Sequence, residues 1–315
     1  MISPGPMIEL TGKKVLVTGA SGFIGKVLTR ELLRAGTEVH GISRLPDEGD
    51  SGGIVWWGGD CTDYDFVRET VGSCRPEIVF HLAGYVYGKR DIDSVLPSLH
   101  GNLTTTVNLL TSLGEEGCEK VVLAGSLEEP DRGSTEAPSS PYAAAKWACD
   151  TYARLFYQLY QVPVVNPRIF MVYGPGHWEK KKLVPYLVNA FLENEETKLT
   201  GGTRKVDWVY VDDVVNGLLA CARSGIVDGS RVDIGTGSLF SVREVAEILC
   251  DLIRPATKPV FGAAPDRPFE QVRAAAAADA KRRIGWNAEV SLRDGLARTV
   301  DWYRQNRRGA PGKLQ

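Results

Sequence analysis

The sequence lacks the paired cysteines of secreted and zinc-binding proteins. Its six cysteines are scattered along the chain, and no two of them form a C-x-x-C pair. Isolated thiols of this kind are typical of reduced core residues in a cytoplasmic protein, and they favour neither disulfides nor zinc ligands. We therefore expect a cytoplasmic protein without a bound metal.

Strong charge of one sign and long apolar runs are also absent. The net charge is −2, so the chain has no polybasic surface that would attract nucleic acid or a membrane. No apolar run is long enough to cross a bilayer, and the opening segment from Met1 to Pro6 is too short and too rich in proline for a signal peptide. We expect neither nucleic acid nor a membrane as a partner.

The sequence instead shows an uninterrupted alternation of short apolar strands and amphipathic helices. The predicted strands end near Thr18, Arg44, Asp60, Gly84 and Ser126. This alternation is typical of an α/β fold with a doubly wound parallel sheet. The length of 315 residues leaves room for a smaller attached lobe.

A glycine-rich segment, Gly19-x-x-Gly22-x-x-Gly25, organises the chain. It joins an apolar strand at Lys13 to Thr18 to a segment with helical spacing at Phe23 to Ala35. Gly19 permits a tight turn, Gly22 lets backbone approach a pyrophosphate, and Gly25 lets the helix pack closely. Free N–H groups at the helix start then hold the phosphates. This context favours a dinucleotide site over a plain glycine turn.

The end of the second strand bears on the choice of cofactor. An acidic residue there would bond the ribose 2′-hydroxyl, but Ser43 and Arg44 stand in its place. A guanidinium can clamp a 2′-phosphate through two hydrogen bonds, so this strand end favours NADP over NAD. The alternative is a solvated arginine at the start of a polar loop.

Two later strand ends add further candidates. Asp60 could accept a hydrogen bond from the adenine amino group, or it could cap the helix that starts near Tyr64. His81 is best explained as a packed histidine at a strand end. The small residues up to Gly84 let backbone lie along the cofactor. A long amphipathic helix is expected over Ser94 to Leu113, with a bracing role for the asparagine within it, Asn102.

The fifth strand and the following helix carry the candidate chemistry. Ser126 ends the strand at the edge where such sheets bind ligands. Tyr142 and Lys146 are four residues apart, so they lie on one face of the helix. An ammonium beside a phenol lowers the phenol's pKa, which suits proton exchange with a substrate oxygen while hydride moves at the adjacent carbon. Ser126 would bond the same oxygen.

Together these motifs resemble the extended short-chain dehydrogenase/reductase superfamily, in its nucleotide-sugar epimerase/dehydratase branch. Later segments fit in order, including Pro167 to Gly176, Val206 to Val214 and Asp233 to Gly237. The resemblance implies a Rossmann-type domain over 1–174 and a small mixed α/β C-terminal substrate lobe over 175–315, some of whose segments return to the first domain. It implies Ser126, Tyr142 and Lys146 as catalytic residues. The cofactor-binding residues that it implies are Gly19, Ser21, Gly22, Phe23, Ile24, Gly25, Ser43, Arg44, Asp60, Cys61, Leu82, Ala83, Gly84, Tyr142 and Lys146.

The departures from the family pattern bear on the reaction. Dehydratases of this family carry Thr-Asp-Glu after the fifth strand, whereas this chain has Ser126, Leu127 and Glu128. Leucine cannot deliver a proton, so a standard 4,6-dehydratase is disfavoured, although Glu128 remains a candidate base. Two expected diphosphate contacts are also replaced, by Met171 and Val206. Candidates that could compensate, each also explicable as a surface charge, are Lys182, Arg204, Lys205, Arg267 and Arg273. Lys182 has the most family-like context.

Two features of the later chain have competing explanations. His177 and Trp178 would lie at the mouth of the substrate cleft, where the indole could stack on a base or sugar, or it could simply anchor the lobe. The helices at Ser94–Leu113 and Tyr142–Tyr160 carry large apolar side chains on more than one side. The resemblance implies that they pair with a second copy in a homodimer, whereas they could also merely cover the sheet.

Three functions are consistent with these features. The first is NADPH-dependent reduction of a 4-keto-sugar, favoured by Arg44 and by the missing dehydratase acid. The second is a nucleotide-sugar epimerase with a tightly bound cofactor, NAD being possible. The third is a protein that senses NADP without chemistry, against which the retained Ser126, Tyr142 and Lys146 argue.

Overall fold

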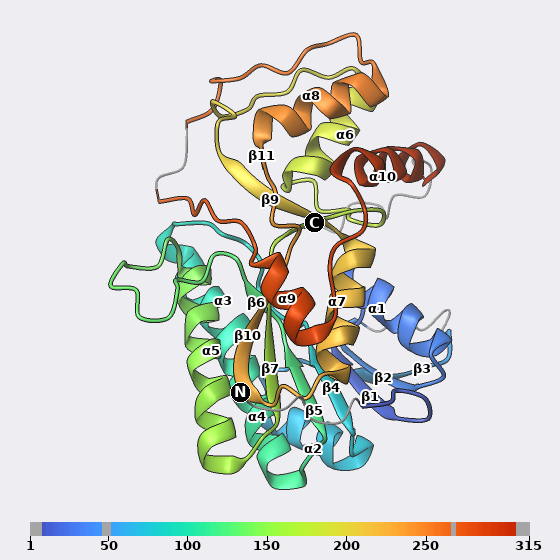
Figure 1. Ribbon diagram of the computed structural model, residues 1–315, viewed down its shortest axis with the longest axis vertical. Coiled ribbons are helices and arrows are strands. Elements are labelled where there is room, and N and C mark those ends of the chain that lie inside the picture. The colour runs from blue at the N-terminus through green and yellow to red at the C-terminus, as the bar shows by residue number, and fades with distance from the viewer. Residues whose placement is uncertain (1–7, 46–51, 266–268, 307–315) are drawn as a thin grey trace. The chain divides into compact units, whose positions relative to one another are not determined.

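The computed structural model describes residues 8–45, 52–265 and 269–306, and the chain divides into two compact units (Figure 1). The first unit contains the chain up to Ile169 together with Val215–Ile234 and Ala278–Trp286. The second contains Phe170–Val214, Gly235–Ala277 and the chain from Asn287 onward. The chain therefore crosses between the two units several times. No helix among the described residues is long and apolar enough to cross a membrane.

The first unit is built on a parallel sheet, as the strand and helix alternation predicts. Its strand order is β10-β7-β5-β4-β1-β2-β3, with the short β6 paired to β7. This is the doubly wound, Rossmann-type arrangement. The strands are β1 Lys14–Thr18, β2 Glu38–Ser43, β3 Ile54–Gly58, β4 Ile78–His81, β5 Lys120–Leu123, β6 Gly125–Ser126, β7 Val164–Ile169 and β10 Asp228–Ile234.

Side chains along each strand alternate between the two faces of the sheet, and the side chains on both faces are buried. Leu16, Val79 and Val121 form one core with apolar residues of the helices on that face. Val17 and Phe80, whose side chains point to the opposite face, are fully buried as well. The helices of this unit are α1 Phe23–Arg34, α2 Tyr64–Cys74, α4 Thr105–Glu116, α5 Pro141–Tyr160 and α9 Ala277–Ile284, and α7 Val211–Arg223 spans both units.

The helix expected over Ser94 to Leu113 is not a uniform α-helix. A 3-10 turn η1 (Ile92–Ser94) and a short α3 (Val95–Ser98) lead into a π-helical segment η2 (Leu99–Thr104), which continues into α4. Asn102 lies inside the π segment and donates to the carbonyl oxygens of Ser98 and Tyr85. Such π segments are frequent at functional sites, and apolar periodicity does not reveal them.

The second unit has its own sheet and core. Strands β8 (Met171–Tyr173) and β9 (Lys205–Tyr210) are parallel, and β11 (Leu239–Ser241) is antiparallel to β9. Helices α6 Leu183–Glu193, α8 Val242–Ile253 and α10 Leu292–Asn306 contribute apolar residues to one core with this sheet. This unit is the mixed α/β part that the sequence predicts.

Candidate active site

The glycine turn between β1 and α1 has no room for a side chain at Gly19 or Gly25. Gly19 has a φ of +71°, and a Cβ on it would lie 2.8 Å from the backbone nitrogen of Ala83. A Cβ on Gly25 would lie 2.2 Å from the carbonyl oxygen of Gly19. Helix α1 begins at Phe23, and its N-cap is Gly22, which has no side chain to cap the N–H groups of the first turn. Close packing of the protein backbone therefore requires glycine at positions 19 and 25, and no side chain caps the N–H groups at the start of α1.

The end of β2 lies against this turn. The hydroxyl oxygen of Ser43 is 2.8 Å from that of Ser21, and the Ser43 hydroxyl also donates to the carbonyl oxygen of Leu45. Ser43 is buried, whereas the following Arg44 is exposed. Arg44 thus directly follows a strand end that is hydrogen-bonded to the glycine turn.

The alternative role predicted for Asp60, capping helix α2, is wrong. The carboxylate of Asp63 accepts from the backbone N–H groups of Asp65 and Phe66 and caps the helix. Asp60 instead accepts from the N–H of Thr62 within the preceding turn, and it is exposed. Cys61 is buried, and this burial raises the pKa of its thiol to about 12.

The exit of β4 lies beside the same turn. The hydroxyl of Thr18 bonds His81 Nδ1 at 2.7 Å and accepts from the N–H of Ala83 at 3.1 Å. Burial, with a smaller effect of Lys146, lowers the pKa of His81 to about 3, so this histidine is a neutral packing residue. A Cβ on Gly84 would lie 2.7 Å from the side-chain oxygen of Asn102 and 3.8 Å from Lys146 Nζ. Gly84 therefore keeps backbone close to Lys146.

Ser126, Tyr142 and Lys146 come together in the first unit. Ser126 ends β6, where it pairs with Ile169 of β7, and it is buried. Helix α5 starts with Pro141 behind the N-cap Ser140, whose hydroxyl accepts from the Ala143 N–H. Tyr142 thus lies in the first turn of α5, and the Ser126 side chain lies close enough to affect the pKa of its phenol.

The electrostatics of Tyr142 differ from the sequence expectation. Desolvation raises the pKa of its phenol above the ordinary value, and the negative charges of Glu129 and Glu128 act in the same direction. The Ser126 side chain lowers the pKa, but its effect does not outweigh the desolvation. Lys146 Nζ donates to the carbonyl oxygen of Ala124 at 2.8 Å. The pKa of the phenol is therefore raised, and not lowered as the sequence predicts.

A comparison with protein families identifies the family to which the chain belongs. The model of the NAD dependent epimerase/dehydratase family matches residues 15–235, which include the glycine turn, Ser126, Tyr142 and Lys146. The chain belongs to this family. It is accordingly an enzyme of the extended short-chain dehydrogenase/reductase type, as the resemblance implied.

Similar proteins extend the match to nearly the whole chain. The epimerase/dehydratase chain is 31% identical to UDP-glucose 4-epimerase of Mycolicibacterium smegmatis, over 92% of this chain and 98% of that protein. It is 27% identical to dTDP-D-glucose 4,6-dehydratase of Mus musculus, over 93% of this chain and 89% of that protein. The solved structure of MoeE5 in complex with UDP-glucose and NAD aligns with a TM-score of 0.83 at 29% identity, covering 93% of this chain and 99% of MoeE5.

Two glutamates follow Ser126 in this epimerase/dehydratase. Glu128 donates its backbone N–H to the Ser126 hydroxyl at 3.3 Å, and its carboxylate accepts from the Ser139 hydroxyl. Glu129, which the sequence analysis did not single out, is fully buried, and its carboxylate accepts the backbone N–H of Ser126 at 2.7 Å. Sequence alone gives no sign that the second of two adjacent glutamates points inward.

The residues predicted to bind substrate belong to the second unit. Met171 lies in β8, and Lys182 is the N-cap residue of α6. Arg204 makes an ion pair with Glu270 at 3.1 Å, and Arg267 lies outside the described residues. The roles of these residues in substrate binding therefore remain predictions.

Trp178 packs within the second unit, in agreement with the anchoring role that was one of the two roles predicted for it. Its ring lies 4.7 Å from that of Trp302 and 5.5 Å from that of Tyr303, centroid to centroid. The Tyr303 hydroxyl donates to the backbone carbonyl of His177. Burial, with a smaller effect of Lys182, lowers the pKa of His177 to about 4, so its imidazole is neutral near pH 7.

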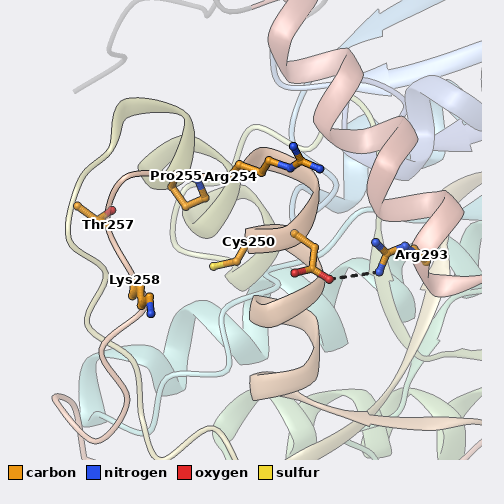
Figure 2. A pocket seen from close by; sticks show the side chains of 7 residues that line it. Cys250, Arg254, Pro255, Thr257, Lys258 and Arg293 are labelled. Carbon is orange, nitrogen blue, oxygen red and sulfur yellow. Dashed lines mark ion pairs between the residues drawn. The ribbon is translucent and has the colours of Figure 1, made fainter.

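A separate cavity of about 450 Å³ lies on the second unit (Figure 2). Asp251 and Arg293, which line it, form an ion pair at 3.6 Å. Its seven lining residues, none of which is a predicted site residue, are Cys250, Asp251, Arg254, Pro255, Thr257, Lys258 and Arg293. Across the described part of the chain, no group of three His, Cys, Asp or Glu residues could hold a metal ion.

Proposed function

We propose that the protein is a nucleotide-sugar 4-epimerase that oxidises a sugar carbon and reduces it again with a cofactor it retains. The observation that carries this proposal is the position of three residues at the carboxyl end of the parallel sheet: Ser126 ends β6, and Tyr142 and Lys146 lie one helical turn apart on α5. The similarity to UDP-glucose 4-epimerase over nearly the whole chain supports the same reaction.

The residues of the first unit fit a nicotinamide dinucleotide. Gly19 and Gly25 let the turn pack tightly against its own backbone and that of Ala83, and the start of α1 would offer backbone N–H groups to a pyrophosphate. Gly84 lets backbone pass close to Lys146. A nicotinamide cofactor held there would supply the acceptor for a hydride from the sugar carbon and the donor that returns it to the opposite face.

The protein's own groups then handle the proton. Tyr142 accepts the hydroxyl proton of the sugar as hydride leaves the same carbon, and it returns the proton in the second half of the reaction. Ser126 donates to the sugar oxygen and holds it beside the phenol. Lys146 supplies a positive charge that favours phenolate once a ligand displaces its bond with Ala124, which offsets the desolvation of Tyr142.

Residue 127 argues against a dehydratase, although the chain is also similar to a dTDP-D-glucose 4,6-dehydratase. Elimination of water needs an acid that protonates the departing hydroxyl. The apolar Leu127 stands where the dehydratases carry that acid, and it is buried. The chain therefore keeps the redox residues and lacks the group that elimination requires.

The cofactor is either NAD or NADP, and two observations point in different directions. The structure of MoeE5 was solved with NAD. The exposed Arg44 directly after β2 favours the 2′-phosphate of NADP, because a guanidinium pairs with phosphate through two hydrogen bonds. The same residue supports the second candidate function, NADPH-dependent reduction of a 4-keto-sugar, because NADPH is the usual donor for net reduction.

We propose a homodimer as the working form. Helix α5 and the segment α3–η2, which contact each other, expose large apolar side chains. These side chains are Val95, Leu96, Leu99, Tyr152, Leu155, Leu159 and Tyr160. A second copy of the same surface would bury them in a symmetric interface.

Incubation with UDP-glucose and with dTDP-glucose tests the function. An epimerase converts one of them to its 4-epimer, detected by NMR, with no net change in the absorbance of reduced nicotinamide and with cofactor released only on denaturation. Consumption of added NADPH by a 4-keto-sugar in proportion to product would instead establish the reductase. Cofactor binding without turnover of any substrate would support the sensor.

A further inference from the structure

A buried carboxylate lies directly behind Ser126. Glu129 Oε1 accepts the Ser126 N–H at 2.7 Å, and the N–H of Glu129 donates back to the Ser126 carbonyl oxygen at 3.0 Å. The hydroxyl of Ser126 meanwhile accepts from the N–H of Glu128 at 3.3 Å. The main chain on both sides of the serine is thus fixed by one residue, and the Ser126 side chain lowers the pKa of the Tyr142 phenol.

The sequence makes room for this carboxylate at position 125. A Cβ on Gly125 would lie 2.8 Å from Glu129 Oε1 and 2.4 Å from the side-chain oxygen of Asn166. Any larger residue would therefore displace Glu129 from the Ser126 N–H. The φ of Gly125 does not lie in the left-handed region. Position 125 therefore requires glycine because glycine has no side chain, and not because of its backbone freedom.

A network of charges holds Glu129 from the other side. Arg231 of β10 places Nη2 3.0 Å from Glu129 Oε2 and 3.0 Å from an oxygen of Asp150 in α5. Arg132 bonds both oxygens of Asp150, and Asn166 of β7 donates to one of them. Two fully buried carboxylates are thus paired with three guanidinium groups, since Arg154 also lies 3.8 Å from Asp150. Of the three, Arg231 forms the ion pair with Glu129.

We propose that Glu129 is a positioning residue of this enzyme: through the Ser126 N–H it holds the serine hydroxyl against Tyr142, and through Arg231 it ties that geometry to β10 and α5. The inference rests on the proposed function, since it assigns Glu129 to the same reaction. It differs from the role considered for Glu128, because Glu129 touches the serine backbone and not the substrate.

The position of Glu129 also predicts a response to pH. Burial raises the pKa of Glu129 to about 7, and the charge of Asp150 adds to the rise. Arg231, the Ser126 N–H and Lys146 lower it. Ionised Glu129 in turn raises the pKa of Tyr142. Protonation below neutrality removes the ion pair with Arg231, so kcat should fall as pH decreases through this range.

The substitution Glu129→Gln tests the proposal with an isosteric side chain. Its amide oxygen still accepts the Ser126 N–H, but its NH₂ group faces a second donor, Arg231. We expect kcat with the accepted nucleotide sugar to fall several-fold, KM and NAD affinity to stay within about twofold, and the inflection near neutral pH to disappear. The inflection that belongs to Tyr142 should move to lower pH, which loss of packing alone would not cause.

Two further variants separate positioning from general damage. Glu129→Leu removes the acceptor, and we expect kcat to fall roughly 10- to 100-fold, because a buried N–H is left unsatisfied. Glu136→Gln, at an exposed carboxylate of the same loop, should leave kcat and its pH profile unchanged. If neither Glu129 variant folds, as judged by loss of NAD binding, the pH profile of the wild-type kcat tests the inference instead. A kcat that stays constant between pH 6 and 8, roughly one unit either side of the Glu129 pKa, overturns the inference.

The outcomes distinguish the inference from the function on which it rests. An active wild-type enzyme with an unchanged rate and pH profile in Glu129→Gln overturns the positioning role and leaves the epimerase proposal standing. A wild-type enzyme that binds cofactor but turns over no nucleotide sugar overturns the proposed function, and the inference with it. Faster amide hydrogen exchange at Ser126 in Glu129→Leu would support the backbone restraint independently of turnover.

Discussion

The Lys146 ammonium donates a hydrogen bond to the carbonyl oxygen of Ala124, at 2.8 Å, at the point where β5 gives way to β6. This bond holds the ammonium under the strand end, one helical turn from the phenol of Tyr142. The phenol itself is desolvated, and its pKa is raised. At neutral pH the phenol of Tyr142 is therefore protonated.

The substitution Tyr142→Phe should abolish turnover while leaving the cofactor bound. Removing one general acid and base costs on the order of 10²- to 10⁴-fold in rate, and the ring remains to fill its place. Steady-state kcat and the NAD dissociation constant measure the two effects separately. Tyr157→Phe, at a partly buried tyrosine of the same helix, is the control and should keep kcat. Equal activity of the two variants would remove Tyr142 from the mechanism.

Replacing Arg44 tests the choice between NADP and NAD. If its guanidinium binds the 2′-phosphate, Arg44→Ala should raise the dissociation constant of NADP about tenfold or more and leave that of NAD unchanged, because only NADP carries this phosphate. Calorimetric titration of both cofactors measures the ratio. Arg68→Ala, at an exposed arginine of α2, should change neither constant. An unchanged NADP affinity in Arg44→Ala identifies the arginine as a solvated residue.

Gly25 offers a sharp test of the glycine turn. In Gly25→Ala the added methyl group would lie 2.2 Å from the Gly19 carbonyl oxygen and 2.8 Å from that of Ala20, both of which are backbone atoms. Helix α1 must move away from the turn, so we expect a loss of about 1–3 kcal/mol in unfolding free energy and weaker cofactor binding. Urea unfolding and cofactor titration measure both.

The control for this change is Gly88→Ala. A Cβ on Gly88 meets nothing within 4 Å, and the φ of this residue does not lie in the left-handed region. Its stability and cofactor affinity should match those of the wild type. A Gly25→Ala protein as stable as Gly88→Ala would show that the turn tolerates side chains.

The sequence was sufficient for features that depend on local spacing. The strand, glycine turn and helix at residues 14–34 follow from apolar period and from three glycines, and the parallel sheet follows from repetition of that unit. Tyr142 and Lys146 share a face because helical geometry alone brings residues four apart together. None of these inferences needed a contact between distant segments.

Features that depend on tertiary contacts were not predictable in the same way. The Asp63 cap is an exception, because it is a local contact next to the expected helix start at Tyr64 and was open to prediction from the sequence. The inward position of Glu129 depends on Arg231, which lies about a hundred residues further along the chain. The raised pKa of Tyr142 likewise results from burial, which spacing does not report.

Leu155→Glu should separate the proposed homodimer into monomers. Leu155 is 40% exposed within the apolar surface of α5, and a charge there would be buried without a partner in a symmetric interface. Sedimentation velocity measures the change in mass. Val260→Glu changes an apolar residue of the same 40% exposure in the second unit, and it should leave the assembly intact. A monomeric wild-type protein contradicts the proposal directly.

Stability should depend on pH through His81. Burial, with a smaller effect of Lys146, lowers its pKa to about 3, whereas an unfolded histidine has a pKa of about 6.5. The folded state therefore holds His81 neutral, and the stability that this contributes is complete above pH 6.5 and is lost as the pH falls from about 6.5 toward 3. At about 1.4 kcal/mol per pH unit, lowering the pH from 7 to 5 should cost the wild type roughly 2 kcal/mol.

The variant His81→Gln isolates this effect, because glutamine does not titrate. Urea unfolding at pH 7 and pH 5 should show a smaller loss in His81→Gln than in the wild type. Other titrating groups, including Glu129, are present in both proteins and largely cancel in the difference. His100→Gln, at an exposed histidine, should behave like the wild type. Parallel losses in wild type and His81→Gln would mean that His81 accepts a proton in the folded protein, and that its bond with Thr18 reorganises to allow it.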